Sequence, residues 1–480
     1  MALNSERPLA RVLGRLVFYS LLVTIALTAI PYGTVQPWWI AVFECAVFVI
    51  AAVAAVDAGV GRGWSKDDLS LFGPLLLLVL FAVFQSLPLF SGLGPLGLGS
   101  SLSADPYGTR LFAIRLLALV VVGVLLLRYT SSKTRLRNLI YVIIAVGLAS
   151  AFIGITRKSF GSGYFLPGLT VIDRSFGQFV NRNHFAFLME MCLGLTLGLI
   201  AGEIGRYRRR LVLLLLAAAF LWVALIYSGS RGGILASLCQ LLFLAFMLDP
   251  IGHLTKARAD EPRSRFQTLA SGVVVRTVPA VCLIIVFVFG VSWVGGEPVV
   301  SNLQQAATDF SQQEMENNVN TSRKEIWSAT WKLIKAHPVV GVGFGGYWLA
   351  IMRYHDASGR MTPQEAHNDY LELIASGGVI GFGLIAWFVV IFLKRVRRPL
   401  NSPNLFYRTA SLGALTGLFG IAVHSFVEFG LHITINALVC MAVLVIAVRS
   451  DWPDERVSAG EVEVGLMPGQ KGTNLIDDGR

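Results

Sequence analysis

The chain has 480 residues, of which 55% are hydrophobic and 14% are charged, and its mean hydropathy is +0.65. This composition is too apolar and too poor in charge for a soluble protein of this length. The formal net charge of +11 does not indicate nucleic-acid binding, because the basic residues form short clusters between apolar runs.

Apolar runs of the length that crosses a hydrocarbon layer recur along almost the whole chain. We therefore expect an all-α polytopic membrane protein with about twelve transmembrane helices, packed as one bundle over residues 1–450. The predicted spans lie near residues 15–32, 37–57, 70–91, 111–127, 138–156, 184–202, 211–228, 232–248, 276–295, 371–393, 406–427 and 430–448. The polar tail at residues 451–480 shows no apolar periodicity, and we expect it to be disordered.

The basic clusters predict which side of the membrane each loop occupies. They lie at residues 62–66, 128–137, 206–210, 256–265 and 394–398, always on the same side of the predicted bundle. By the positive-inside rule this side is cytoplasmic, and both termini join it. This sidedness depends on the tight turn at Tyr227–Gly233, because its loss would invert every later span.

Two loops on the opposite side, at residues 157–183 and 296–370, are longer than simple connectors. The second, between spans 9 and 10, contains a helix start at Ser322–Glu325 with the spacing of a capping box. An apolar stripe follows, formed by Trp327, Trp331 and Ile334. We expect this helix to end near Pro338 and to lie along the membrane surface, with its tryptophans at headgroup level.

Polar residues from separate parts of the chain gather near the non-cytoplasmic side of the predicted bundle. They are Asn181, Arg182, Asn183, His184, Ser228, Ser230, Arg231, Arg323, His367, Asn368, Asp369, His424, Glu428 and His432. A charged group at a membrane boundary costs free energy unless it is paired, hydrated or used, so this convergence predicts a functional site.

The arginines are candidates for anion binding. Arg231 opens an apolar helix after Ser-Gly-Ser, where a large anion can approach both the guanidinium and exposed backbone N–H groups. The alternative is an arginine that marks a helix end, and the flanking glycines favour the phosphate contact. Arg323 lies one turn before Trp327 and points either at a substrate pyrophosphate or at lipid headgroups; spacing alone does not separate the two.

The histidines are open to two interpretations. Asn181–His184 begins a span and serves either substrate binding or helix capping. His367 and Asn368 precede another span, where an imidazole is suited to act as a general base, although a helix-end histidine bonded to a backbone carbonyl has the same spacing.

His424, Glu428 and His432 recur every four residues, a spacing that superficially matches metal ligands on one helix face. The pair Phe429-Gly430 interrupts that helix, and no outer DxD motif or second histidine pair supports a metal. The sequence therefore favours a hydrogen-bonded pocket wall here over a metal site.

Four patches of sequence carry a family pattern. His367-Asn368 is followed after nine residues by Gly378 and after two more by Gly381, an H-N-x9-G-x-x-G pattern. The other patches are Ser230–Gly233, Ser322–Pro338, and the pair of segments 177–186 and 424–432. Together they resemble the O-antigen ligase and polymerase superfamily over residues 170–445, whereas the first third of the chain contributes only hydrophobicity.

This resemblance implies a glycosyltransferase of the bacterial inner membrane that uses undecaprenyl-pyrophosphate-linked glycans on the periplasmic side. It implies His367 as the base or orienter for the acceptor hydroxyl, and Arg231 and Arg323 as clamps on the departing pyrophosphate. The residues expected to bind substrate are Asn181, Arg182, Asn183, His184, Ser230, Asn368, His424, Glu428 and His432. Its partners would be the lipid-linked donor, a glycan or lipid acceptor and the bilayer, with no nucleic acid.

The chemistry expected from these groups is an inverting, metal-independent transfer. Fixed arginines stabilise the negative charge that builds on a leaving pyrophosphate, which is the task of a divalent metal in many glycosyl transfers. Since no carboxylate is evidently placed as a covalent nucleophile, direct attack by the acceptor would invert the anomeric centre. We therefore expect neither a metal ion nor another cofactor.

Three alternatives stay open at this point. A ligase and a repeat-unit polymerase differ only in the acceptor, which these motifs do not specify. A transporter of the same lipid-linked glycans would show internal repeats, broken helices and ionisable groups near the midplane. A membrane scaffold would leave the outer histidines and arginines without a role.

Overall fold

The computed structural model describes residues 8–31, 33–60, 69–90, 92, 94–95, 100–160, 175–248, 323–355 and 363–450. Over these residues the named elements are all helices, and the β-structure consists of one isolated bridge between Phe176 and Phe179. Eight of the helices are long and apolar enough to cross a membrane. The all-α, multi-pass architecture predicted from the sequence is thus confirmed.

The long helices in chain order are α1 (Pro8–Thr28), α2 (Pro37–Val60), α5 (Pro106–Tyr129), α6 (Lys133–Phe160), α7 (Arg182–Glu203), α8 (Arg208–Ser228), α14 (Asp369–Leu400) and α15 (Leu405–His424). Three shorter apolar helices are α4 (Gly73–Gln85), α9 (Arg231–Met247) and α16 (Thr434–Val448). Each lies on a predicted span. The predicted span 276–295 and the tail 451–480 lie outside the described residues.

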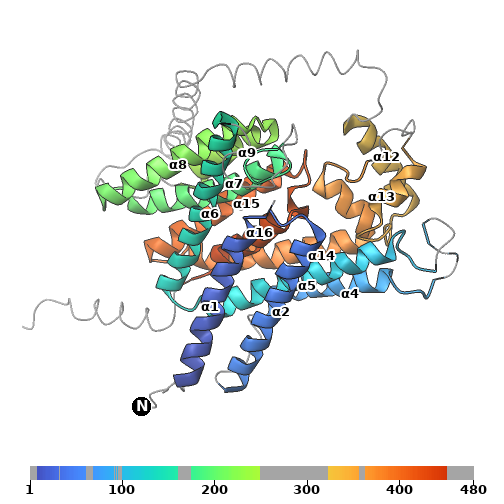
Figure 1. Cartoon of the computed structure of the whole chain (residues 1–480), viewed down its shortest axis with the longest axis horizontal. Helices are drawn as coiled ribbons and strands as arrows, with labels where there is room; N and C mark the ends of the chain where they lie inside the picture. The colour runs from blue at the N-terminus through green and yellow to red at the C-terminus, as the bar shows by residue number, and fades with distance from the viewer. Residues whose placement is uncertain are drawn as a thin grey trace, which may run out of the picture.

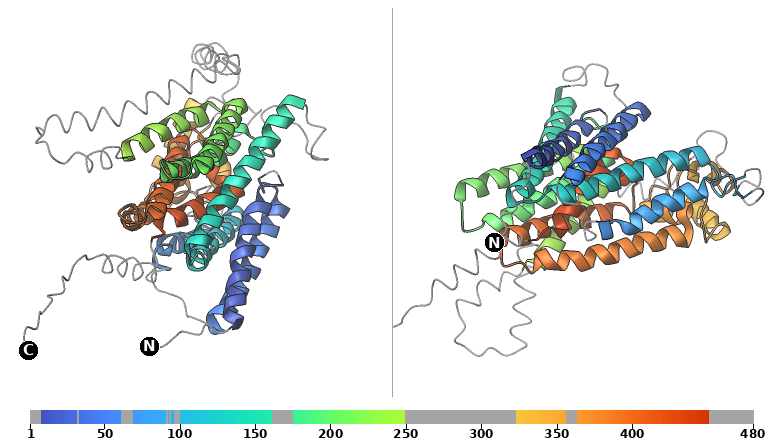
Figure 2. Two further views of the ribbon diagram at one scale, coloured as in Figure 1. Left: turned by 90° about the vertical axis from the view of Figure 1, so that its left-hand side faces the viewer. Right: turned by 90° about the horizontal axis from the view of Figure 1, so that it is seen from below.

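Helices α7 and α15 form the centre of the bundle, with α8 and α9 on one side and the pair α1 and α2 on the other (Figures 1 and 2). Glycines let the two central helices approach closely. A Cβ atom added to Gly194 of α7 would lie 2.3 Å from the backbone nitrogen of Gly417 in α15. Small residues at such a crossing are typical of membrane helix pairs, where close van der Waals packing drives association.

The tight turn between α8 and α9 has the form that the sequence predicts. Gly229 closes α8 with a φ of +72°, and the hydroxyl of Ser230 accepts the backbone N–H of Gly233 at 3.1 Å to cap α9. Glycine adopts this left-handed conformation without strain, and serine is a favoured N-cap. The chain therefore ends one helix and starts the next within two residues, which places Arg231 at the first position of α9.

Helix α14 is broken at Gly378, where φ is +58° and ψ is −160°. The freed carbonyl groups of Ala375 and Ser376 accept the N–H groups of Val342 and Gly343, both at 3.0 Å. A Cβ atom on Gly378 would lie 2.3 Å from the carbonyl oxygen of Val339. The first glycine of the H-N-x9-G-x-x-G pattern thus allows the segment before α13 (Tyr347–Ala350) to dock on α14.

The helix predicted after Ser322 is α12 (Arg323–Ala336), and Ser322 itself lies outside the described residues. The three side chains of the predicted apolar stripe lie in different environments. Ile334 is buried at 7% exposure, whereas Trp331 is 50% exposed. The indole N–H of Trp327 donates to the carbonyl of Ala366 at 3.0 Å. Helix α12 packs against α14, and its residues Ala329, Leu333 and Ile334 form a buried cluster that includes Ala375 of α14, which divides the stripe.

Candidate functional site

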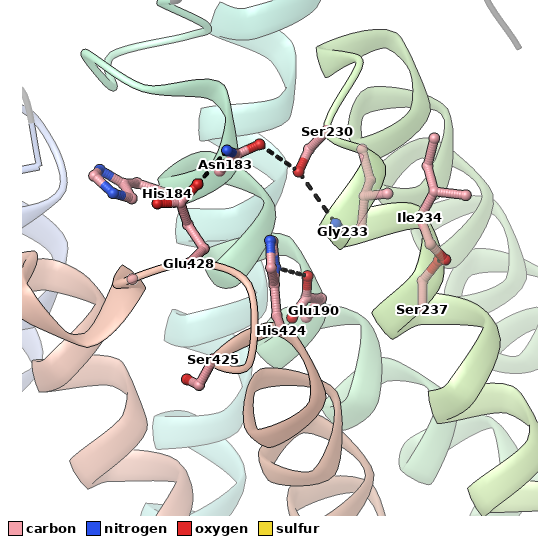
Figure 3. Close-up of polar contacts among 12 residues, drawn as sticks. Asn183, His184, Glu190, Ser230, Gly233, Ile234, Ser237, His424, Ser425 and Glu428 are labelled. Atoms are coloured by element: carbon pink, nitrogen blue, oxygen red, sulfur yellow. Dashed lines mark hydrogen bonds and ion pairs between the residues drawn. The ribbon is translucent and has the colours of Figure 1, made fainter. Parts of the chain in front are cut away.

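A buried carboxylate, that of Glu428, joins three of the patches singled out in the sequence. Its Oε1 atom lies 2.9 Å from Nδ1 of His367, and its Oε2 atom lies 3.2 Å from a guanidinium nitrogen of Arg323. The side-chain amide of Asn183, at the start of α7, also donates to Oε2 (Figure 3). The Glu428 side chain is only 1% exposed. Residues that are 61, 105 and 245 positions away in the chain therefore meet at one carboxylate, which lies between α15 and the short helix η2 (Gly430–His432).

The electrostatic environment keeps Glu428 ionised. Burial by itself would raise the pKa of this carboxyl, but the hydrogen bond and charge of His367 and the charge of Arg323 lower it to about 2. A buried carboxylate with several donors is stabilised in its charged form. Glu428 is thus a fixed negative charge at neutral pH.

His367 is held in a constrained backbone conformation. Its φ is +50°, a left-handed value that among the described non-glycine residues only Thr34 shares. Both neighbours are fixed: Ala366 donates its N–H to Glu372 at 2.8 Å, and the side chain of Asn368 caps α14 by accepting the N–H groups of Tyr370 and Leu371. Such conformations persist where surrounding contacts enforce them, and they concentrate at functional sites. The His367 side chain remains 35% exposed, so its ring is accessible.

A hydrogen-bonded relay connects Glu428 to the start of α9. The Ser230 hydroxyl donates to Oδ1 of Asn183 at 2.8 Å, while the Asn183 amide donates to Glu428 (Figure 3). Ser230 directly precedes the half-buried Arg231. The starts of α7 and α9 consequently lie at the same end of the bundle, as the predicted sidedness requires for these two helices.

His424 belongs to a different polar pair. Its Nδ1 atom lies 2.7 Å from Oε1 of Glu190 in α7, and both side chains are almost fully buried (Figure 3). A Cβ atom on Gly232 would lie 2.5 Å from Nε2 of His424, so the His424 ring packs closely against the first turn of α9. Sequence reasoning missed Glu190, although a lone carboxylate inside an apolar span is a signal of a structural or functional role.

His432 has a third set of partners. Its Nδ1 atom lies 3.3 Å from Glu365, and its Nε2 atom lies 3.6 Å from Glu372 and 3.7 Å from Asp369. Burial lowers the pKa of this histidine, but the three carboxylates outweigh it and raise the pKa well above its usual value. This environment favours an imidazolium that neutralises the acids. Atoms of Glu365, Glu372 and His432 lie within 4.8 Å of one another, a spacing that could also hold a cation, and we assign no ion to them.

The four-residue spacing of His424, Glu428 and His432 therefore does not create a shared metal site in the described part of the chain. Helix α15 ends at His424, and the chain then turns before η2. Because the helical register stops there, the three side chains point to three different partner groups. Their contacts in the structure are with protein groups, and the hydrogen-bonded wall expected from the sequence stays a prediction.

The remaining predicted residues lie at the start of α7. Asn181 caps this helix by accepting the N–H of Asn183 at 2.8 Å, which is the capping role weighed in the sequence. His184 is 6% exposed and packs edge-to-face against Phe429, with ring centroids 4.8 Å apart. Arg182 is exposed at the same helix end. The ring of Phe429 also contacts His367 and His432, so one aromatic ring touches three histidines.

Comparison with known proteins agrees with the motif-based resemblance. The family model described as O-antigen ligase matches residues 215–386. The matched segment contains Arg231, Arg323 and His367, whereas Asn183 and Glu428 lie outside it. A search of curated proteins returned no match.

Proposed function

We propose that this multi-pass membrane protein, which carries an O-antigen ligase domain at residues 215–386, transfers a glycan from an undecaprenyl pyrophosphate carrier to an acceptor hydroxyl. The observation that carries the proposal is the arrangement around Glu428. It combines an accessible imidazole in a constrained conformation with a guanidinium held on the same carboxylate. A proton acceptor beside a cationic group is what displacement of a pyrophosphate by a hydroxyl requires.

In the proposed reaction, the acceptor hydroxyl gives its proton to Nε2 of His367 while its oxygen bonds to the anomeric carbon. The bond from that carbon to the phosphate oxygen breaks, and the electron pair leaves with the pyrophosphate. Arg323 and Arg231 bind the charge that accumulates on the leaving group, which stabilises the transition state more than the ground state. A single displacement inverts the anomeric centre, and the arginines make a divalent metal unnecessary.

The proposal includes the sidedness expected from the basic clusters. We place the protein in a bacterial inner membrane with both termini cytoplasmic and the site on the periplasmic face. The donor glycan would then reach the site only after it has been moved across the membrane. The expected substrate contacts of Asn183, Ser230 and Asn368 are limited in this proposal, because these side chains already make hydrogen bonds at helix starts.

The test is a transfer assay on the full chain in nanodiscs, with undecaprenyl-pyrophosphate-linked glycan and candidate acceptors. His367→Ala and Arg231→Ala are expected to abolish most transfer, while Gln364→Ala, a change at an exposed neighbour, keeps the wild-type rate. Full transfer by folded His367→Ala protein would contradict the site. Activity that disappears with chelator and returns with Mg²⁺ or Mn²⁺ would contradict metal independence.

The size of the product distinguishes a ligase from a polymerase. One large addition to a new acceptor indicates a ligase, and a ladder growing on the lipid carrier indicates a polymerase. The break in α14 is a feature that transporters also show. Its freed carbonyl groups accept the backbone N–H groups of Val342 and Gly343, however. This favours a role in docking that segment over a role as an ion or substrate site.

A further inference from the structure

We infer that Glu428 is the positioning residue of this site, which orients the His367 imidazole and holds Arg323 beside it. This inference rests on the proposed function, because it assigns the partner through which the proposed base acts. From the sequence, Glu428 was expected to contact substrate. The structure instead surrounds its carboxylate with protein donors.

The first argument is the occupancy of the carboxylate. A buried charge is costly unless donors surround it, and the loss of one partner leaves the other group unpaired. Both oxygens of Glu428 accept hydrogen bonds, one from His367 and the other from Arg323 and Asn183. With 1% of its side chain exposed, Glu428 presents almost no surface to a substrate. Its action must therefore pass through its partners.

The second argument concerns the tautomer of the imidazole. An ionised carboxylate only accepts hydrogen bonds, so the Nδ1 atom of His367 that faces it carries the proton. The lone pair of a neutral ring then lies on Nε2, at the opposite side of the ring. This is the atom that takes the acceptor proton in the proposed reaction. The imidazolium that forms is stabilised by the adjacent carboxylate, as in other histidine–carboxylate pairs.

The third argument is the balance of charge between the base and the clamp. Arg323 and Glu428 form an ion pair at 3.2 Å, so the carboxylate that contacts His367 is also paired with a guanidinium. The Arg323 side chain is 46% exposed, so it has surface available for a pyrophosphate while it contacts Glu428. One carboxylate thus fixes the relative position of the proton acceptor and the charge that receives the leaving group.

A double-mutant cycle tests this inference in the full chain. Glu428→Gln keeps the size of the side chain but presents an uncharged amide, and we expect kcat to fall by about 10²-fold or more. Glu428→Ala should lower kcat at least as much. In the His367→Ala background, the same Glu428 substitutions should change the residual rate by less than about threefold, because groups that act as a unit are not additive. A matched change at an exposed carboxylate, Glu325→Gln, should leave the rate unchanged.

A second measurement determines the tautomer of His367 independently of glycan transfer. In ¹⁵N NMR of the imidazole, the wild-type resonance assigned by His367→Ala should show a protonated Nδ1, and Glu428→Gln should lose this preference. Full activity of Glu428→Gln, additive losses in the cycle or an unchanged tautomer would each overturn the inference. A wild-type protein with the expected tautomer but no glycan transfer would overturn the proposed function and leave the positioning role standing.

Discussion

Nδ1 of His367 lies 2.9 Å from Oε1 of Glu428, although 61 residues separate them in the chain. The contact places the proposed base against a buried carboxylate. We predict that His367→Gln, which keeps a hydrogen-bonding group but removes a base that is effective near neutral pH, lowers kcat by roughly 10²–10⁴-fold. Single-turnover transfer with saturating donor measures this loss. A drop confined to KM would contradict the role of a base.

The low pKa of Glu428 predicts how the stability of the protein depends on pH. Its folded pKa of about 2 is below the ordinary value of 4.5, so its stabilising contribution is complete above pH 4.5 and is lost as pH falls towards 2. This shift corresponds to about 3 kcal/mol. Thermal unfolding in detergent should therefore show a stability difference between wild type and Glu428→Gln that does not shrink between pH 8 and 5. A difference that disappears near pH 6 would contradict the assignment, and Glu325→Gln provides the exposed control.

Arg323 should not tolerate replacement by lysine. Its guanidinium offers several donors in a fixed plane, so it can contact Glu428 and a phosphate together, whereas an ammonium is a compact point charge. We expect Arg323→Ala to lower kcat/KM for the lipid-linked donor by about 10²-fold and Arg323→Lys to recover only part of this loss. Lys332→Ala, an exposed change on the same helix, serves as the control in the same assay. Equal activity of the lysine variant would show that charge alone suffices.

Two glycines of α14 provide a matched test of the break in this helix. Gly378 has a φ of +58°, and a Cβ there would meet the Val339 carbonyl at 2.3 Å, whereas a Cβ on Gly383 would meet nothing within 4 Å. We predict that Gly378→Ala destabilises the protein by about 2 kcal/mol or more, because this conformation is almost restricted to glycine. Gly383→Ala should be neutral or stabilising by about 0.5–1 kcal/mol. Thermal unfolding of the two variants gives the comparison, and similar melting temperatures would contradict the docking role.

The buried Glu190–His424 pair predicts a pattern of stability. Glu190→Leu leaves His424 without its partner and should cost about 3–5 kcal/mol, as single removals from buried pairs do. The double variant Glu190→Leu/His424→Leu should recover much of the loss, because no unpaired polar group remains. Detergent-solubilised protein can be compared by thermal unfolding. A double variant less stable than both single variants would contradict the pairing.

The helical bundle was predictable because its signal is local. Each apolar run satisfies its own backbone hydrogen bonds, so length and hydropathy locate helices such as α7 and α8 within a few residues. The turn at Gly229 and Ser230 was also readable from residue type, since glycine and serine favour these helix-end conformations. The motifs around His367, Arg231 and Arg323 lie inside the segment that the family model matches, and the roles expected for these residues stay predictions.

Partner choice was not predictable from spacing. His424, Glu428 and His432 follow one another at intervals of four, yet the chain leaves its helix after His424 and each side chain turns to a different group. The division of the Trp327 stripe has the same kind of cause, because Ala366 comes from a distant segment. Sequence determined which residues lie at helix ends, since helix formation depends on neighbours in the chain. Only tertiary structure decided that Glu428 contacts both His367 and Arg323, because a buried charge takes its donors from whatever segments packing brings to it.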